Sequence, residues 1–276
     1  APALKTADIG CAMGIVGTDV AKEAADVILT DDNFSTVVSA VEEGRRIYDN
    51  ILKAIQFLLS SNVGEIIILF VAILMTPLLS KWFNIDVNLI TPLLPIHILW
   101  INLVTDSLPA LALAVDPAEK DIMNRKPLKP KQGVFTKGMT FRVIYQGIMI
   151  GVLTLVAFSI GNKYYGLEVG RTMAFLSIGL LELIHSFNIK SEQSIFKIGI
   201  LENKYLIGSF ILGTIVQTIV VIIPQLAKIF KLIPLNQTQW LITIAISLLP
   251  IPIMELQKRV NKIKLGKIIY VKKQEA

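Results

Sequence analysis

Cysteine and histidine are almost absent from this 276-residue chain, which has one Cys and two His, and only 17% of its residues are charged. The single cysteine, Cys11, excludes an internal disulfide and with it a disulfide-based scaffold. Hydrophobic residues make up 53% of the chain, which excludes a disordered chain and a nucleic-acid-binding module. The mean hydropathy of +0.63 is instead typical of a membrane protein.

The hydrophobic residues are concentrated in six stretches. A helix of about 20 residues crosses the ~30 Å hydrocarbon core of a bilayer, and each stretch has about that length. We therefore expect an α-helical polytopic membrane protein with the lipid bilayer as its partner. The expected transmembrane helices cover residues of about 51–76, 89–114, 139–160, 172–188, 203–224 and 238–256.

The net charge of +6 is explained by topology rather than by a polyanionic partner, because the basic residues are unevenly distributed. The connection 115–138, the next connection on the same side and the C-terminal tail together hold sixteen Lys and Arg, whereas the loops on the other side hold five. Cytoplasmic loops are enriched in Lys and Arg, so both termini are predicted to be cytoplasmic. We expect no nucleic-acid partner, and a basic tail that lies near anionic lipid.

The first 45 residues differ from the rest of the chain. The segments ADIGCAMG and VILTDDNF alternate short apolar runs with Gly and Asp turns, and GTDVAKEAADV between them has helical spacing. This pattern predicts the closing βαβ portion of a soluble α/β domain over residues 1–45, followed by a transmembrane domain over 46–276. The chain does not begin with Met or a signal peptide, and we expect it to be a fragment of a longer protein.

The first transmembrane helix is expected to be longer than the membrane is thick. We expect Gly44 to interrupt the preceding helix and a new helix to run from Arg46 to Met75. Such a helix has a length of ~45 Å, which exceeds the hydrocarbon core by ~15 Å. This predicts a stalk between the soluble portion and the membrane.

Polar and acidic residues lie inside three of the spans. The first two share a face of the first span, the next three are spaced to share a face of the second, and the last lies near the middle of the fourth. Burying a carboxylate in hydrocarbon costs several kcal/mol unless it is protonated, hydrated or paired with a cation, so these residues are candidates for a functional site. They are Asn62, Glu65, Asn102, Thr105, Asp106 and Glu182.

Protons or metal ions must supply the compensating charge, because no Lys or Arg lies in the middle of a span. The six side chains offer up to nine oxygens, and Ca²⁺ binds roughly 6 to 8 oxygen ligands. One Ca²⁺ is therefore accounted for, and a second needs water, backbone carbonyls or helices outside this chain. Pro92, Pro95 and Pro109 are expected to loosen the second span, which can turn carbonyls toward a cavity.

Each candidate also has a structural explanation. Asn62 is well suited to an interhelical hydrogen bond, Glu65 to a protonated hydrogen-bonding carboxyl, and Glu182 to a position nearer the interface. His97 and His185 are expected to be polar interface residues rather than proton relays.

The motifs ADIGCAMG, SSNVGE, LLPIHILWINLVTDSLPALALAVDP and DIMNRKP resemble the C-terminal part of P-type ATPases, over the whole chain. The calcium-transporting branch, with the sarco/endoplasmic reticulum and bacterial calcium pumps, is most similar. The resemblance implies that residues 1–45 end a haloacid-dehalogenase-like phosphorylation domain, that the connection 115–138 touches this domain, and that the spans are the fifth to tenth of ten. It implies the same six residues as Ca²⁺ ligands: Asn62, Glu65, Asn102, Thr105, Asp106 and Glu182.

The resemblance also shows what this chain lacks. It has no Asp-Lys-Thr-Gly-Thr phosphorylation motif, no Thr-Gly-Glu loop and no nucleotide-binding domain, so ATP and Mg²⁺ are expected to bind in the remaining N-terminal portion of the same pump. This chain alone is expected not to hydrolyse ATP and to hold no catalytic residue.

The implied function is ATP-driven transport of Ca²⁺ out of the cytoplasm with proton counter-transport, in a bacterial cell membrane or alternatively in the endoplasmic reticulum. Alternatives are a pump for Mn²⁺, Na⁺ or H⁺, and a passive cation-binding membrane subunit or channel.

Overall fold

The computed structural model describes residues 1–83, 91–119, 121–127, 133, 135, 137–191 and 193–261. The beginning of the predicted second span, parts of the connection 115–138 and the basic tail from residue 262 onward lie outside the described residues. The chain divides into two compact units, one of residues 1–49 with 118–127 and one of residues 50–117 with 128–276.

The first unit contains the predicted βαβ arrangement. After the short helix α1 (Pro2–Thr6), strand β1 (Cys11–Met13), helix α2 (Asp19–Ala24) and strand β2 (Val27–Leu29) follow in order. The two strands pair in parallel, with Cys11 opposite Val27. The Asp32 carboxylate then accepts hydrogen bonds from the backbone N–H groups of Ile15 and Val16, at 2.8 and 2.7 Å. The bond from Ile15 is the main reason that the pKa of Asp32 lies below its ordinary value.

The second segment of this unit is held by arginine side chains. It contains the 3₁₀-helix η3 (Ile122–Asn124). The guanidinium of Arg125 forms ion pairs with Asp49 and Glu119, each at 2.7 Å, and Arg45 donates to the carbonyl of Ile122 at 2.8 Å. Residues 118–127 therefore pack on the beginning of the long helix α3.

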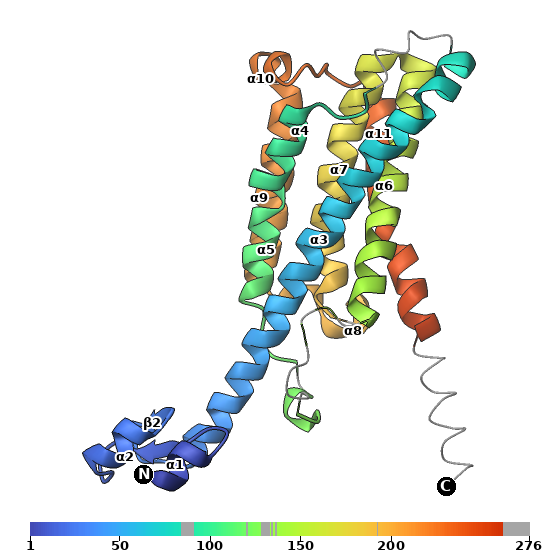
Figure 1. The fold of residues 1–276 in the computed structure, drawn as a ribbon. Helices are drawn as coiled ribbons and strands as arrows, with labels where there is room; N and C mark the ends of the chain where they lie inside the picture. The colour runs from blue at the N-terminus through green and yellow to red at the C-terminus, as the bar shows by residue number, and fades with distance from the viewer. Residues whose placement is uncertain are drawn as a thin grey trace, which may run out of the picture. The chain divides into compact units, whose positions relative to one another are not determined.

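Six helices are long and apolar enough to cross a membrane, as the sequence predicts. The first is α3 (Ser35–Phe83), and the second is a composite of α4 (Pro95–Trp100), the π-helix η2 (Ile101–Thr105) and α5 (Ser107–Ala114). The others are α6 (Lys137–Tyr165), α7 (Leu167–Ile189), α9 (Lys204–Ile222), and α11 (Gln237–Leu248) with its helical continuation to Asn261. Short helices α8 (Ile195–Ile198), η4 (Ile200–Glu202) and α10 (Pro224–Ile229) lie in the connections (Figure 1).

The expected break at Gly44 is wrong, because α3 continues through this position for 49 residues. A glycine inside a helix costs only about 1 kcal/mol relative to alanine, which is too little to end a long helix by itself. The expected beginning of the helix at Arg46 is wrong for the same reason. Instead, the Asn33 side chain accepts the backbone N–H of Ser35 at 3.0 Å, at the point where α3 begins.

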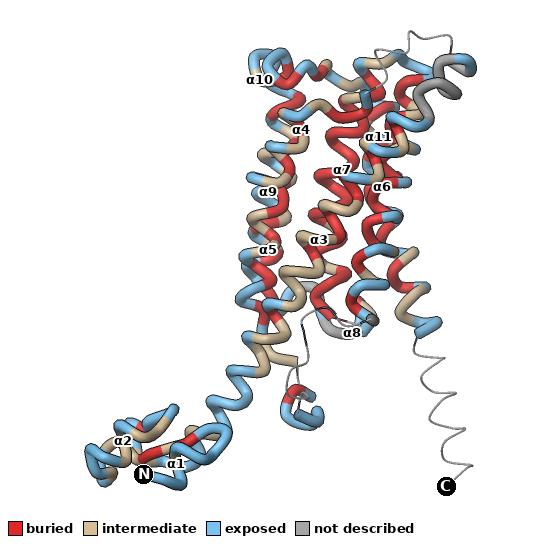
Figure 2. Tube along the Cα trace, viewed as in Figure 1, coloured by how far each residue is buried: buried red, intermediate tan, exposed pale blue. Residues whose placement is uncertain are grey.

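Helix α7 forms the centre of the second unit. It contacts α6, α9 and α11. In its 18-residue apolar stretch, 94% is buried inside the protein, and most of the helix is buried in Figure 2. Its side chains Phe175, Leu176, Ile178 and Leu181 are fully buried in the main hydrophobic cluster. A polar residue in the second half of α7, such as Glu182, is therefore enclosed by protein.

Helices α3 and α6 approach each other closely at glycines. A Cβ atom added at Gly147 would lie 2.4 Å from the Val63 side chain, and one added at Gly64 would lie 2.9 Å from Ile150. No larger residue fits at either position without moving a helix. Because Gly64 precedes Glu65, this contact fixes the position of the first candidate carboxylate.

Candidate cation-binding site

The second span is interrupted where its polar residues lie. The backbone N–H of Asp106 donates to the carbonyl of Ile101, five residues earlier, at 2.9 Å. Proline has no N–H, so Pro109 leaves the carbonyl of Thr105 without the donor that an α-helix would provide. The loosening expected from proline is thus observed as a π-helical segment, which is a frequent feature of functional sites.

That Asn102, Thr105 and Asp106 share one face stays a prediction, and their contacts in the structure differ. That prediction assumed 3.6 residues per turn, and the wider π turn rotates successive side chains differently. Asn102 contacts Glu65 of α3, whereas the Thr105 hydroxyl contacts Gln217 of α9. Asp106 interacts with α7. Three side chains close in sequence therefore contact three different helices.

Glu65 is held by the amide of Asn102. The Nδ2 atom of Asn102 donates to both carboxylate oxygens, at 2.7 and 2.8 Å, and to the carbonyl of Ile98 at 3.0 Å. These three acceptors fix which end of the amide is nitrogen. Glu65 is only 5% exposed, so this hydrogen-bonded pair joins α3 to the second span inside the membrane region.

Asp106 and Glu182 form an unusual pair, since both are buried and no cationic side chain among the described residues pairs with either of them. Their exposed fractions are 1% and 0%, and none of their four carboxylate oxygens has a hydrogen-bond partner among the described residues. The two carboxyls act on each other, and Glu65 acts electrostatically on both. Two buried carboxylates in this arrangement are unfavourable unless a cation or protons neutralise them.

Asn62 does not take part in this arrangement through its nitrogen. Its Nδ2 atom donates to the carbonyl of Leu58, one turn earlier in the same helix, at 2.8 Å. The bond lies within α3 and is not the interhelical bond considered as the alternative. The role of its side-chain oxygen as a ligand stays a prediction.

The carboxylates alone do not form a metal cluster. In the part of the chain that the structure describes, no group of three or more His, Cys, Asp and Glu side chains is placed to hold a metal ion. A cation at the Asp106–Glu182 pair would therefore also need neutral oxygens, for which hydroxyl and amide side chains such as Thr105 and Asn102 are suited.

Sequence analysis did not identify Gln217, which lies in the middle of α9 and is 0% exposed. Its Oε1 atom accepts hydrogen bonds from Trp100 at 3.1 Å and from Thr105 at 3.2 Å, and its Nε2 atom donates to the carbonyl of Phe175 at 2.8 Å. A glutamine inside the apolar stretch ILGTIVQTIVVI was the available signal.

The two histidines differ in their contacts. His97 accepts the backbone N–H of Leu94 with Nδ1 at 3.2 Å, and its Nε2 lies 2.6 Å from the carbonyl of Phe230. Both ring nitrogens of His97 are thus bound to backbone groups, and its role as a polar interface residue stays a prediction. His185 is buried, and neither of its ring nitrogens has a hydrogen-bond partner among the described residues.

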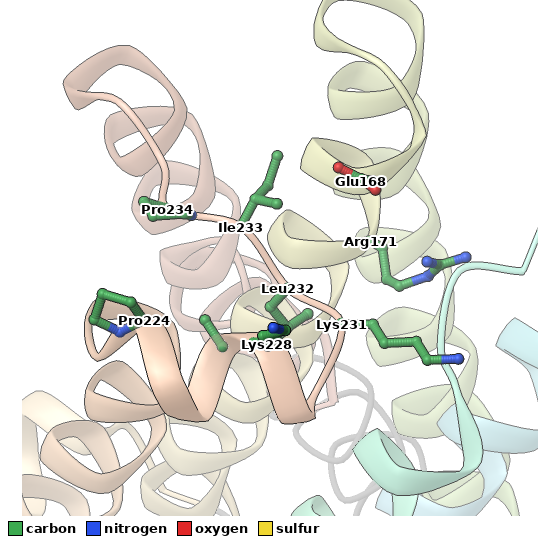
Figure 3. A pocket seen from close by; sticks show the side chains of 9 residues that line it. Glu168, Arg171, Pro224, Lys228, Lys231, Leu232, Ile233 and Pro234 are labelled. Atoms are coloured by element: carbon green, nitrogen blue, oxygen red, sulfur yellow. The ribbon is translucent and has the colours of Figure 1, made fainter.

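A cavity of about 390 Å³ lies elsewhere, between the beginning of α7 and the connection that contains α10 (Figure 3). None of the six candidate residues lines it. Its charged lining residues are Arg171, Lys228, Lys231 and Glu168, and a mainly cationic lining does not suit a cation. The cavity is therefore separate from the candidate site.

The six apolar helices and the buried acidic pair define a multi-pass membrane protein with polar groups inside its helix bundle. Residues 90–260 match the family described as cation transporting ATPase, C-terminus, and the chain belongs to this family.

The chain is also similar to proteins named as calcium-transporting ATPases, and it spans about 30% of their length. It is 48% identical over 280 residues to calcium-transporting ATPase 1 of Bacillus cereus, which covers 95% of this chain and 30% of that protein. It is 45% identical to the calcium-transporting ATPase of Bacillus subtilis, covering 91% of this chain and 27% of the relative. With the endoplasmic reticulum calcium ATPase srcA of Aspergillus fumigatus the identity is 34%, covering 94% and 29%.

Proposed function

We propose that this chain forms the ion-binding membrane part of a P-type pump that uses ATP to move Ca²⁺ out of the cytoplasm. The observation that supports this most is the pair Asp106 and Glu182, which is buried without compensation inside the helix bundle. The printed names of the relatives favour Ca²⁺ as the transported ion. Oxygen ligands also suit Ca²⁺ better than a soft metal.

In this proposal the cation binds between α3, the second span and α7. Asp106 and Glu182 supply charge, and Asn62, Asn102 and Thr105 add neutral oxygens. Glu65 is proposed to become a third carboxylate ligand when the cation binds, because the three carboxyls of the described residues are not yet gathered around one point. When the cation leaves, the carboxylates remain in a region of low dielectric constant, where protonation is the available way to neutralise them. Proton counter-transport follows from this exchange.

The ATP-dependent steps belong to the remaining N-terminal portion of the same pump, where ATP and Mg²⁺ bind. We propose that residues 1–45 end its phosphorylation domain. The uninterrupted helix α3 (Ser35–Phe83) supports a mechanical link from that domain to Glu65. The excess of basic residues in one set of loops supports cytoplasmic termini, and a bacterial cell membrane is the proposed location.

The cation profile of the intact protein tests this proposal. The protein that contains this chain is reconstituted in vesicles, and ATP hydrolysis and ion uptake are measured with Ca²⁺, Mn²⁺ or Na⁺. We expect Ca²⁺ to activate both at the lowest concentration. Activation by Mn²⁺ or Na⁺ instead would identify a pump for another cation, and uptake that does not need ATP would indicate a passive channel.

A further inference from the structure

Gln217 connects three segments that are far apart in the sequence. Its amide contacts Trp100 and Thr105 of the second span and the Phe175 carbonyl of α7, although Gln217 itself lies on α9. The residue is fully buried. The Gln217 amide is therefore part of the packed interior, where three hydrogen bonds satisfy it.

Two partners determine the orientation of this amide, because one of them can only accept a hydrogen bond and the other can only donate one. The Phe175 carbonyl, 2.8 Å away, needs a donor, so it faces the Nε2 atom. The Trp100 indole is a donor only, so it faces the Oε1 atom at 3.1 Å. Reversing the amide would place donor against donor and acceptor against acceptor.

The space for the amide is also restricted by α7. A Cβ atom added at Gly179 would lie 2.6 Å from the Nε2 atom of Gln217. Glycine at this position leaves room for the amide to pack directly against the backbone of α7. The Oε1 atom is therefore held in one place, beside Thr105.

This orientation decides the role of the Thr105 hydroxyl. The Oε1 atom carries no hydrogen, so at the 3.2 Å contact Thr105 must be the donor. A hydroxyl has one hydrogen and two lone pairs. With its hydrogen given to Gln217, Thr105 offers only lone pairs to its other neighbours, which is the state that a metal ligand requires.

We propose that Gln217 is a positioning residue of the cation site, which makes Thr105 a ligand by holding its hydroxyl hydrogen away from the cation. The proposal rests on the proposed function, because it assigns a cation to the site. Partners of this kind orient the groups that bind a metal, and their loss typically lowers affinity about 10- to 100-fold.

The test measures the Ca²⁺ dependence of phosphorylation by ATP in the intact protein. Gln217→Met removes the acceptor and is expected to raise the half-activating Ca²⁺ concentration about tenfold, while the maximal level stays near that of the wild type. Gln217→Glu, which burial in the apolar bundle keeps protonated, retains an acceptor oxygen toward Thr105 and an O–H donor toward the Phe175 carbonyl, and is expected to stay close to the wild type. The control is Ser209→Ala on the same helix, whose hydroxyl donates to the Leu206 carbonyl of α9 itself.

A double-mutant cycle shows whether Gln217 acts through Thr105. Thr105→Val should weaken the Ca²⁺ response by itself, and Gln217→Met should then add less than about a twofold change. Full additivity, or a wild-type response of Gln217→Met, would overturn the inference. Equal loss in Gln217→Met and Gln217→Glu would overturn it as well. A wild-type protein that shows no Ca²⁺ response would instead contradict the proposed function.

Discussion

Asp106 and Asp116 lie ten residues apart, are each 1% exposed, and differ completely in their surroundings. Asp116 pairs with Lys53 at 2.9 Å through one oxygen and accepts from Asn203 at 2.8 Å through the other. In the part of the chain that the structure describes, neither oxygen of Asp106 has a hydrogen-bond donor.

The difference separates a structural carboxylate from a functional one. At Asp116, α3, the end of α5 and the beginning of α9 are joined by a satisfied network, in which the Asn50 amide also donates to the Asp116 carbonyl at 2.8 Å. At Asp106 the protein leaves the same group without a cation of its own. A buried charge that the fold does not compensate is best explained by an ion that comes from outside.

The largest difference between the two aspartates is expected when each is replaced by asparagine. We expect Asp106→Asn to abolish Ca²⁺-dependent phosphorylation, equivalent to at least about a hundredfold loss of affinity or about 2.7 kcal/mol. Its thermal stability should be equal or higher, because an uncompensated buried charge is removed. Asp116→Asn should show the reverse pattern, with reduced stability and a nearly normal Ca²⁺ response. Full activity of Asp106→Asn would remove this residue from the site.

The structural role of Asp116 predicts a large loss of stability when its charge is deleted. Asp116→Leu leaves Lys53, whose side chain is 13% exposed, without a counterion, and we expect a loss of about 3 kcal/mol in the free energy of unfolding. The matched variant Lys53→Met combined with Asp116→Leu should recover most of it. Unfolding in lipid nanodiscs measures both, and equal stabilities for the single and double variants would contradict the ion-pair explanation.

The packing that places Glu65 can be tested at Gly147. Gly147→Ala puts a methyl group 2.4 Å from the Cγ1 atom of Val63. Helices α3 and α6 must then separate, which we expect to lower the free energy of unfolding by about 1–3 kcal/mol. The control is Gly208→Ala, because an added Cβ at Gly208 meets nothing within 4 Å. Equal unfolding temperatures for these two variants would show that the glycine contact is not needed.

The smallest effect is expected at the exposed ion pairs of Arg125. Its side chain is 39% exposed, so its pairs with Asp49 and Glu119 are screened by water and salt. Arg125→Gln should lower stability by no more than about 1 kcal/mol, and the difference should shrink as the salt concentration rises. A salt-independent loss as large as that of Asp116→Leu would remove the distinction between buried and exposed pairs.

The sequence was sufficient to predict the six spans and the βαβ segment, because apolar length and short apolar runs between Gly and Asp turns depend only on neighbouring residues. It also identified Glu65, Asp106 and Glu182, since a carboxylate inside an apolar stretch is unusual wherever its partners lie. The cost of burying these carboxylates is predicted from the apolar residues around each one, without knowledge of tertiary contacts.

Helical periodicity assumes 3.6 residues per turn and therefore does not predict the π turn at Ile101–Thr105. The partnership of Thr105 with Gln217 joins residues more than 100 positions apart, so no spacing rule indicates it. At Gly44, the local penalty of glycine was overestimated relative to the length of α3.

Locating the cation directly would test the central claim that oxygens from α3, the second span and α7 meet to hold it. Anomalous diffraction from crystals of the intact protein in Ca²⁺ should show one peak between Asp106 and Glu182, about 2.3–2.6 Å from their oxygens. A peak bound by other residues, with no ion between these two carboxyls, would contradict the account.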